Sequence, residues 1–445
     1  MKYQLIKPIN KNYSAIEQIL TNRGIEYKDL KHYLNTTDED INSPLLLGED
    51  KLKNAASLIA AVVIEDLKCA VIVDSDCDGF SSSALLINYL YDVFPHWANR
   101  KLFWIIHEEK EHGLKDCCDE IIKNGCSLVI VPDAGSNNYE YHKILKDNGI
   151  DTIVIDHHEA EKESEDAIII NNQLSDYPNK FLSGAGVTWQ FCRYIDMQIE
   201  KDYANNYLDL VALSLVSDMM SIKSIETKQV IFKGFREENI KNPFIYEIIK
   251  KNNFSLNKTD YKPSADNDLL ITPMGAAFFI APFVNAIVRS GSQEEKELIF
   301  KSMLKKCAFE EVISTKRGHK ENEKERLVDQ AMRVCTNVKN RQTKAQDEGM
   351  ELLENMIIKN NMLEKHKVLL FLLESGQINK NIAGLVANKI MNKYQRPVCV
   401  LTKVINEMED GKKMISYQGS ARGYGVEMMF KDICAGASST IYAEG

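Results

Sequence analysis

The spacing of apolar and polar residues predicts that strands and helices alternate in the first half of the chain. Five short runs are rich in valine, isoleucine and leucine, at residues 71–73, 102–106, 128–131, 152–155 and 168–170. The segments between them carry apolar residues at helical spacing, at 52–67, 81–90, 114–124 and 139–148. Continuous apolar runs are typical of strands buried on both faces of a parallel sheet. The alternation therefore predicts an α/β fold with a doubly wound, mostly parallel sheet.

The rest of the chain predicts a helical connection and a smaller α/β domain. Residues 321–354 have the pattern of a long amphipathic helix, with Leu327, Ala331, Val334 and Val338 on its buried stripe. After residue 366 we expect strands at 368–373, 398–401 and 414–417 and a helix at 382–394. The expected parts are a helical lead-in at 1–50, the main sheet domain at 51–235, a helical connecting region with the long helix at 236–355, and the small domain at 356–445.

Acidic side chains directly follow four of the apolar segments. They are Asp74, Asp76 and Asp78 after the first strand, Asp133 after the third, Asp156 with His157 and His158 after the fourth, and Asp218 after an apolar segment at 208–217. A single aspartate in this position is commonly the cap of the next helix. The carboxyl ends of strands in open α/β sheets are also where ligands bind, and acids crowded there repel one another unless a cation balances them. Four such segments therefore predict a metal site.

The types of ligand narrow the choice of metal. Hard divalent ions prefer oxygen, and neutral imidazole binds manganese, iron or zinc better than calcium. Several carboxylates with one or two histidines suit a two-metal cluster, which activates water and neutralises charge on phosphoryl oxygens. We expect two divalent cations as cofactors, Mn²⁺ or Mg²⁺.

Length and cysteine usage limit the class of protein. A chain of 445 residues is long enough for two or three domains. It contains no uninterrupted apolar run of membrane-spanning length and begins without a signal-peptide core, so we expect no membrane association and a cytoplasmic location. The ten cysteines include no Cys-x-x-Cys pair, which suits reduced, buried thiols.

The charge is acidic overall but basic in one segment. A net charge of −9 argues against a simple nucleic-acid-binding module, whose surface would be basic. Residues 301–344, however, contain 12 lysines or arginines and 6 acids. Part of this segment is expected to be a solvated helix face, and it is also the best candidate for a surface that follows phosphates.

The acidic motifs resemble those of a known family. Asp156-His157-His158 resembles the signature of the DHH phosphoesterases, and Asp76-Cys77-Asp78-Gly79 resembles their first motif. Within that family the chain is most similar to the RecJ group of single-strand-specific exonucleases. The similarity covers nearly the whole length and includes residues 22–25, 183–187, 209–213, 285–289, 384–387, 396–398 and 419–422.

The resemblance implies roles for individual residues. The metal ligands of DHH enzymes match Asp76, Asp78, Asp133, His157 and Asp218, with Asp133 best placed to bridge two metals. His158 matches a histidine near the scissile phosphate, and Asp74 would be a further ligand or a support for the ligands. Phosphate-holding groups match Arg289, Gly419, Ser420 and Arg422, because a planar guanidinium suits phosphate oxygens. For an isolated arginine, a surface salt bridge is the commoner role.

The same resemblance implies a substrate and a pathway. The substrate would be single-stranded DNA, degraded from 5′ to 3′ in DNA repair, recombination or replication. Two other functions are compatible with the residues. A DHH enzyme for short oligonucleotides or cyclic dinucleotides would use the same metals, although such chains usually lack the long helix. An inactive replication scaffold of the same fold would have lost the carboxylates, whereas every motif acid is present in this chain.

Two features depart from the family pattern. Members carry Trp-His-x-Gly before the last helix motif, whereas this chain has Ile378-Asn379-Lys380-Asn381, so Asn379 or Lys380 would have to replace the histidine. Members also continue with a Gly-Gly-His segment, and bacterial RecJ proteins append an oligonucleotide-binding fold; neither is found in these 445 residues. Because affinity for a long strand grows with the number of phosphates engaged, we expect a distributive enzyme unless a single-strand-binding partner tethers it.

Overall fold

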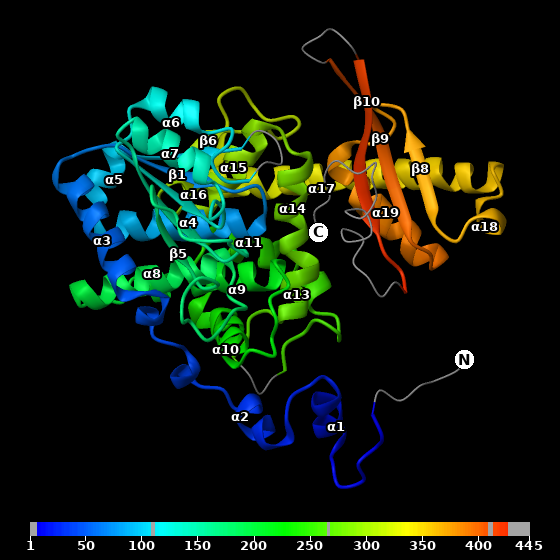
Figure 1. Ribbon diagram of the computed structural model, residues 1–445, viewed down its shortest axis with the longest axis horizontal. Coiled ribbons are helices and arrows are strands. Elements are labelled where there is room, and N and C mark those ends of the chain that lie inside the picture. The colour runs from blue at the N-terminus through cyan, green and yellow to red at the C-terminus, as the bar shows by residue number, and fades with distance from the viewer. Residues whose placement is uncertain (1–6, 108–111, 265–267, 408–412, 426–445) are drawn as a thin grey trace. The chain divides into compact units, whose positions relative to one another are not determined.

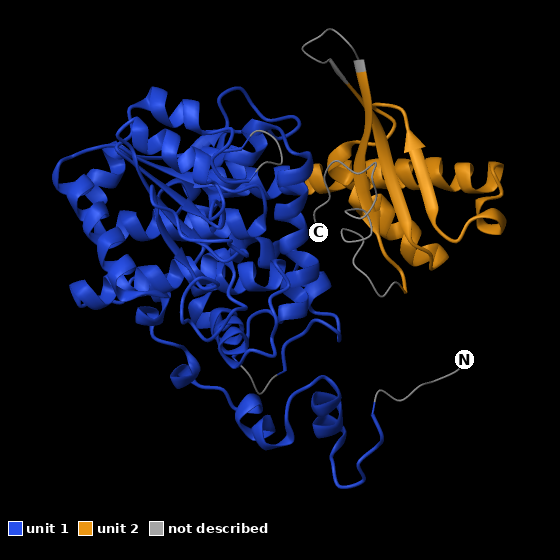
Figure 2. Ribbon diagram, in the orientation of Figure 1, with its two compact units in different colours: residues 1–335 blue, residues 336–445 orange. Residues whose placement is uncertain are grey.

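The computed structural model describes residues 7–107, 112–264, 268–407 and 413–425. The chain divides into two compact units, Met1–Cys335 and Thr336–Gly445 (Figure 2). The boundary between them falls inside one long helix, α17 (Leu327–Lys359). The finer division into four parts stays a prediction.

Five parallel strands form the sheet of the first unit, in the order β2-β1-β3-β4-β5 (Figure 1). Their bounds are β1 Cys69–Val73, β2 Leu102–Ile106, β3 Leu128–Pro132, β4 Asp151–Asp156 and β5 Ile168–Asn171. Neighbouring strands pair in parallel, so that Val71 lies beside Trp104 on one side and Ile130 on the other. The parallel α/β sheet expected from the apolar runs is therefore confirmed.

Helices cover both faces of this sheet, which explains why its strands are apolar throughout. Every residue of β1 and β3 is buried. On one face, alternate residues such as Ile72 and Val129 share a core with α6 (Cys118–Asn124) and α7 (Tyr139–Asp147). The other face is covered by α3 (Glu49–Ile64), α4 (Cys77–Val93) and α8 (Gly184–Ile199). Burial of apolar area on both faces, at about 25 cal/mol per Å², is what holds the layers together.

The strand order reverses next to β1, and this reversal positions the acids. β2 adds to one side of β1, whereas β3 and the later strands add to the other. The carboxyl ends of β1 and β3 therefore border the crevice in which open α/β sheets bind ligands. Asp74, Asp76 and Asp78 follow β1, and Asp133 follows β3.

One predicted boundary near the acidic motifs was wrong. The helix expected at 81–90 begins at Cys77, because Asp76 caps it by accepting a hydrogen bond from the Gly79 backbone N–H at 2.9 Å. Asp78 therefore lies in the first turn of α4 and not in a loop. The apolar segment at 208–217, for which the sequence left the type of element open, is helix α9 (Leu208–Ser217). A continuous apolar run does not by itself distinguish a buried strand from a buried helix.

The first unit contains further helices. They are α1 (Ala15–Asn22) and α2 (Leu30–Leu34) in the lead-in, α5 (Pro95–Lys101), α10 (Ile225–Gly234), α11 (Pro243–Lys251), α12 (Asn253–Leu256), α13 (Pro273–Phe279), α14 (Ala281–Ser290), α15 (Gln293–Met303) and α16 (Lys305–Ala308).

One stretch of the described residues is long and apolar enough to cross a membrane by length and composition. It is Pro273–Ser290, of which 44% is buried. It consists of two helices, α13 and α14, which are separated at Ile280. Core helices of ordinary proteins pass the same test, so the expectation of no membrane association stays a prediction.

A hairpin of two short strands, β6 (Glu311–Ile313) and β7 (Lys324–Arg326), precedes α17. The long helix was expected to begin at residue 321 and begins instead at Leu327. The charged, exposed residues of the hairpin resemble the polar face of a helix, which accounts for the wrong boundary.

The second unit has its own sheet and core. Its strands are β8 (Leu369–Leu373), β9 (Val398–Glu407) and β10 (Lys413–Arg422), in the order β10-β9-β8, and its other helices are α18 (Met362–Lys365) and α19 (Lys380–Tyr394). Phe371 and Val400 of the sheet pack with Val386 of α19 and Leu353 of α17. The smaller α/β domain is confirmed, but β9 and β10 are both longer than expected. Residues 419–422, expected as a loop after a strand, lie within β10.

Candidate active site

The structure brings the predicted metal-site residues of the first unit together at one edge of the sheet. His157 Nε2 lies 3.2 Å from Asp133 Oδ1, 3.6 Å from Asp78 Oδ2 and 3.7 Å from Asp218 Oδ2. In an adjoining group, carboxylate oxygens of Asp74, Asp76 and Asp133 lie within 4.8 Å of one another. Asp133 thus borders both groups, which is the position expected of a residue that bridges two cations.

Two buried atoms at the centre of this site lack hydrogen-bond partners among the described residues. Asp133 and His157 are 1% and 7% exposed, and Asp133 Oδ1 and His157 Nε2 face each other without forming a hydrogen bond. Burial, reinforced by the negative charges of Asp78 and Asp76, raises the pKa of Asp133 well above its ordinary value. Burial also lowers the pKa of His157, which favours the neutral imidazole that metals bind. An unpaired buried carboxylate is costly, so the arrangement fits divalent cations held by these residues.

The start of α8 holds Asp78. The Asp78 carboxylate accepts hydrogen bonds from the backbone N–H groups of Gly184 at 2.7 Å and Ala185 at 2.9 Å, and from the Ser214 hydroxyl at 2.5 Å. The first N–H groups of a helix have no partner within the helix, and the helix dipole favours an anion there. Residue 184 has to be glycine, because an added Cβ would lie 2.3 Å from Asp133 Oδ1.

Asp74 has a partner that the sequence did not reveal. Asp74 is buried, its Oδ2 lies 2.6 Å from His112 Nδ1, and its Oδ1 accepts the Gly113 backbone N–H at 3.3 Å. Burial raises the pKa of Asp74, and the hydrogen bond from His112 opposes this effect. Asp74 therefore supports His112, and its geometry also allows it to be a ligand. The only sequence signal for His112 was a histidine on the connection that follows β2 at the same sheet edge.

Asp156 orients both histidines of its motif. Its Oδ1 accepts the backbone N–H groups of His157 at 2.7 Å and His158 at 3.2 Å, and lies 2.8 Å from His158 Nδ1. Burial alone would raise the pKa of Asp156, but the hydrogen bond and charge of His158 hold it below its ordinary value. The same hydrogen bond raises the pKa of His158 to about 9. His158 is therefore cationic near neutral pH, with a side chain that is 58% exposed at the site.

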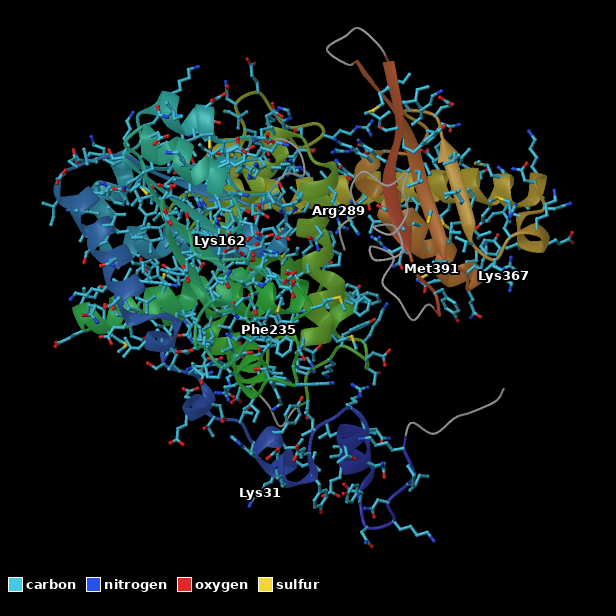
Figure 3. The ribbon with its side chains drawn as sticks, viewed as in Figure 1. Lys31, Lys162, Phe235, Arg289, Lys367 and Met391 are labelled. Carbon is cyan, nitrogen blue, oxygen red and sulfur yellow. The ribbon has the colours of Figure 1, made fainter. Side chains whose placement is uncertain are left out.

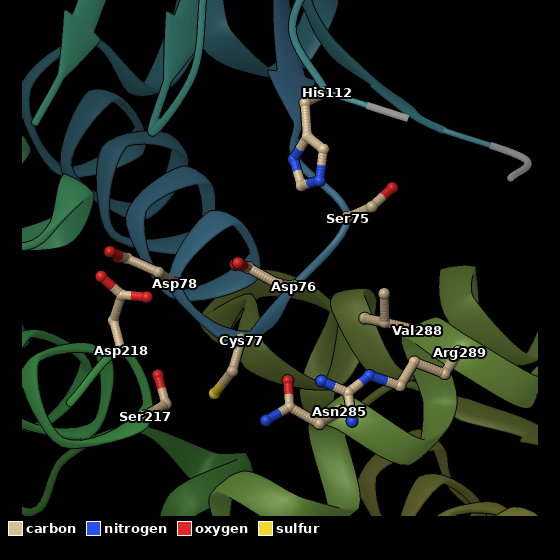
Figure 4. A pocket seen from close by; sticks show the side chains of 10 residues that line it. All are labelled: Ser75, Asp76, Cys77, Asp78, His112, Ser217, Asp218, Asn285, Val288 and Arg289. Atoms are coloured by element: carbon tan, nitrogen blue, oxygen red, sulfur yellow. The ribbon is translucent and has the colours of Figure 1, made fainter. Parts of the chain in front are cut away.

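A pocket of about 160 Å³ opens beside the acids (Figure 4). Asp78 and Asp218 face it from one side, and Asn285 and Arg289 of α14 face it from the other. The predicted phosphate-holding Arg289 (Figure 3) thus lies in the same pocket as the acids. Burial and the charges of Asp78 and Asp76 raise the pKa of Asp218 to about 7. Asn285 belongs to the family-like stretch 285–289, but no role was predicted for it.

The other predicted residues lie in the second unit. An added Cβ on Gly384 of α19 would meet Arg422 Nη2 at 2.6 Å and Ser420 Oγ at 3.2 Å, so Ser420 and Arg422 both lie against the start of that helix. Gly419 lies against β9, where an added Cβ would meet the Val400 carbonyl oxygen at 1.9 Å. Their role in holding phosphate stays a prediction.

The position of the family histidine is occupied by a helix cap. The Asn379 side chain accepts the Asn381 backbone N–H at 2.8 Å and thereby caps α19. Its carbonyl oxygen is therefore engaged in the helix cap, which leaves only its amide N–H₂ as a group that could stand in for the histidine.

Known proteins resemble this chain in sequence. The family model described as "DHH family, N-terminal domain" matches residues 68–215. A prophage-derived protein of Bacillus subtilis (strain 168), named as the single-strand DNA-specific exonuclease YorK, is 36% identical over 428 residues, which is 95% of this chain and 68% of that protein. The single-stranded-DNA-specific exonuclease RecJ of the same organism is 23% identical over 394 residues, which is 87% of this chain and 44% of RecJ.

Solved structures show the same fold. RecJ of Thermus thermophilus in complex with Mn²⁺ has a TM-score of 0.60 at 19% identity, over 84% of this chain and 50% of that chain. A crystal structure of exonuclease RecJ bound to manganese has a TM-score of 0.58 at 18% identity, over 79% of each chain.

Proposed function

The chain belongs to the DHH family of phosphoesterases and to its RecJ group, and we propose that it is a metal-dependent exonuclease that degrades single-stranded DNA from the 5′ end. The observation that carries the proposal is the pair of buried atoms without hydrogen-bond partners among the described residues, Asp133 Oδ1 and His157 Nε2. They belong to an acidic site that borders, through Asp78 and Asp218, a pocket containing Arg289. Acids for cations and an arginine for phosphate are the two requirements of phosphodiester hydrolysis by water.

Five residues of this chain are suited to hold the cations. Asp76, Asp78, Asp133, His157 and Asp218 would hold two divalent ions, and the related RecJ structures contain Mn²⁺ or Mg²⁺. When bound, such ions activate water and neutralise charge on phosphoryl oxygens.

The surrounding residues supply positioning. Arg289 can hold a phosphate in the pocket through its planar fork of N–H groups. His158, kept cationic and oriented by Asp156, can donate a hydrogen bond from Nε2 to a phosphoryl oxygen. The backbone N–H groups of Gly184 and Ala185 hold the Asp78 carboxylate in position beside the other acids.

End-labelled substrates test the proposal. With Mn²⁺ supplied, a 5′-labelled single strand should release labelled mononucleotide from the first turnover, whereas a 3′-labelled strand should shorten gradually. A blunt duplex should be cut poorly, because the relatives are named as single-strand-specific exonucleases. Equal rates on single strand and blunt duplex would contradict the proposed preference for single-stranded DNA. Gradual shortening of the 5′-labelled strand would contradict the proposed 5′-to-3′ direction.

We also propose the cellular setting. Reduced thiols support a cytoplasmic location: eight of the nine cysteines within the described residues are free and buried. We place the enzyme in DNA repair, recombination or replication because these processes expose the single-stranded DNA on which its relatives are named as acting. A single-strand-binding protein as tether would offset the weak attraction that a net charge of −9 gives for DNA.

A further inference from the structure

The hairpin of β6 and β7 carries cations that the proposed chemistry does not use. Its strands pair in antiparallel register, from Glu311 opposite Arg326 to Ile313 opposite Lys324. The ten residues between them, 314–323, form a loop, and all but Ser314 are exposed. Its cations are Lys316, Arg317, Lys320 and, when protonated, His319.

A buried carboxylate holds the base of this loop. Glu325 is 7% exposed and accepts two hydrogen bonds from Arg333 of α17, at 2.6 and 2.8 Å. It also accepts the Thr315 backbone N–H at 3.2 Å, and Arg333 donates to the Thr315 hydroxyl at 2.9 Å. The hydrogen bonds from Arg333 keep the pKa of Glu325 below its ordinary value, so this carboxylate stays ionised and paired. A buried pair of this kind costs desolvation and specifies one geometry.

Backbone hydrogen bonds then shape the tip. The Ser314 N–H donates to the Glu323 carbonyl at 2.8 Å, and the His319 N–H donates to the Lys316 carbonyl at 3.1 Å. The Lys320 N–H donates to the Glu323 carboxylate at 3.0 Å, and Gly318 turns the chain with a φ of +79°. The loop is therefore ordered before any partner arrives, which lowers the entropy cost of binding.

Most acidic side chains of the hairpin form ion pairs or hydrogen bonds, whereas two of its cationic side chains form no ion pair within the described residues. Glu311 pairs with Lys324 at 3.3 Å, and Glu325 pairs with both Arg333 and Lys316. Arg317 and Lys320 have no ion-pair partner within the part of the chain that the structure describes. One carboxylate of the tip, Glu321, is likewise unpaired there. Removing its negative charge should therefore change binding in the direction opposite to removing a positive charge.

We propose that the tip of this hairpin binds the phosphate backbone of a long single strand outside the catalytic pocket. The proposal rests on the exonuclease function proposed above and adds to it the place where the rest of the strand is held. A chain with a net charge of −9 attracts nucleic acid only where its cations are concentrated and unpaired. Arginine and lysine on an ordered loop meet this requirement, because each phosphate contact releases a counterion.

Binding measurements on three charge variants test the proposal. With metal chelated to prevent hydrolysis, fluorescence anisotropy of a long labelled single strand gives the affinity over a range of salt concentrations. If both cations contact phosphate, R317Q/K320Q should lower the salt slope by about 1.4 and the affinity at 0.1 M salt by about 25-fold. E321Q should act in the opposite direction and tighten binding, because it removes a repelling charge. The control K123Q/K201Q removes two exposed lysines at the ends of α6 and α8 that lie far from the site end of the sheet, and it should change neither quantity.

Hydrolysis assays distinguish the role of the hairpin from that of the catalytic site. With Mn²⁺, R317Q/K320Q should hydrolyse a dinucleotide at the wild-type rate and show a raised KM only on longer strands. Unchanged affinity and salt slope in R317Q/K320Q on every length of strand would overturn the proposal, as would a loss confined to duplex DNA. Failure of the wild type to hydrolyse any single strand would instead count against the proposed function, so the two failures are distinguishable.

Discussion

Replacing Asp218 by asparagine should stabilise the metal-free protein at alkaline pH and abolish its response to manganese. Asp218 follows α9, and its carboxylate lies 3.7 Å from His157 Nε2. Burial, together with the negative charges of Asp78 and Asp76, raises its pKa from 3.8 to about 7. The folded protein therefore binds this proton more tightly than the unfolded chain does.

The sign and the size of the effect follow from that difference. Stability falls as pH rises wherever the folded state retains a proton that the unfolded chain has lost, here between pH 3.8 and about 7. The whole difference corresponds to about 4 kcal/mol of unfolding free energy. Because the side chain is 32% exposed, solvent screening reduces this to about 2 kcal/mol. Asparagine at residue 218 avoids the cost, whereas a bound divalent cation makes the same carboxylate favourable.

Urea unfolding followed by tryptophan fluorescence measures the first unit alone, because Trp97, Trp104 and Trp189 all lie in it. With metal chelated at pH 8, D218N should be about 2 kcal/mol more stable than the wild type, and at pH 5 the difference should shrink. Manganese at 100 times its Kd should then stabilise the wild type by about 2.7 kcal/mol and the variant far less. The control D147N neutralises an exposed carboxylate of α7 and should show none of these changes.

Two results would refute the reasoning. If D218N and the wild type are equally stable at pH 8 without metal, then the Asp218 carboxylate is not held in an unfavourable environment. If manganese stabilises both proteins equally, then Asp218 is not part of the metal site.

Three further predictions concern catalysis. Asp133→Ala or His157→Ala should abolish manganese-dependent hydrolysis while tryptophan fluorescence stays native, and wild-type turnover in either variant would remove that residue from the site. Arg422→Ala should raise KM without changing manganese affinity measured by calorimetry, whereas a loss of bound metal would mean that Arg422 supports the core. The enzyme should also be distributive, which means that it releases a long strand after few cleavages. Excess unlabelled strand, added after a long labelled strand has bound, should therefore stop digestion of the labelled strand. Complete digestion of the labelled strand in the presence of this competitor would show that the enzyme is processive.

The strands of both sheets and the ends at which acids gather were determined by the sequence itself. A continuous apolar run such as residues 128–131 indicates a strand that is buried on both faces. This signal can be read from the segment alone, without knowledge of its neighbours. The chain order of strands and helices then places Asp76 and Asp133 at the same edge of a parallel sheet, because right-handed crossovers leave little other choice. The gathering of acids at this edge of the sheet could therefore be predicted from local signals.

Partners distant in sequence were decided only by the tertiary structure. Three contacts join segments whose local sequences give no sign of each other. They are the pairing of Asp74 with His112, the position of Arg289 across the pocket from Asp218, and the pairing of Glu325 with Arg333. The same holds for α9, whose apolar run fits a buried strand as well as a buried helix until its neighbours are known. The physical reason is that such contacts depend on how elements pack, and packing is set by the shapes of several elements together and not by the period of any one of them.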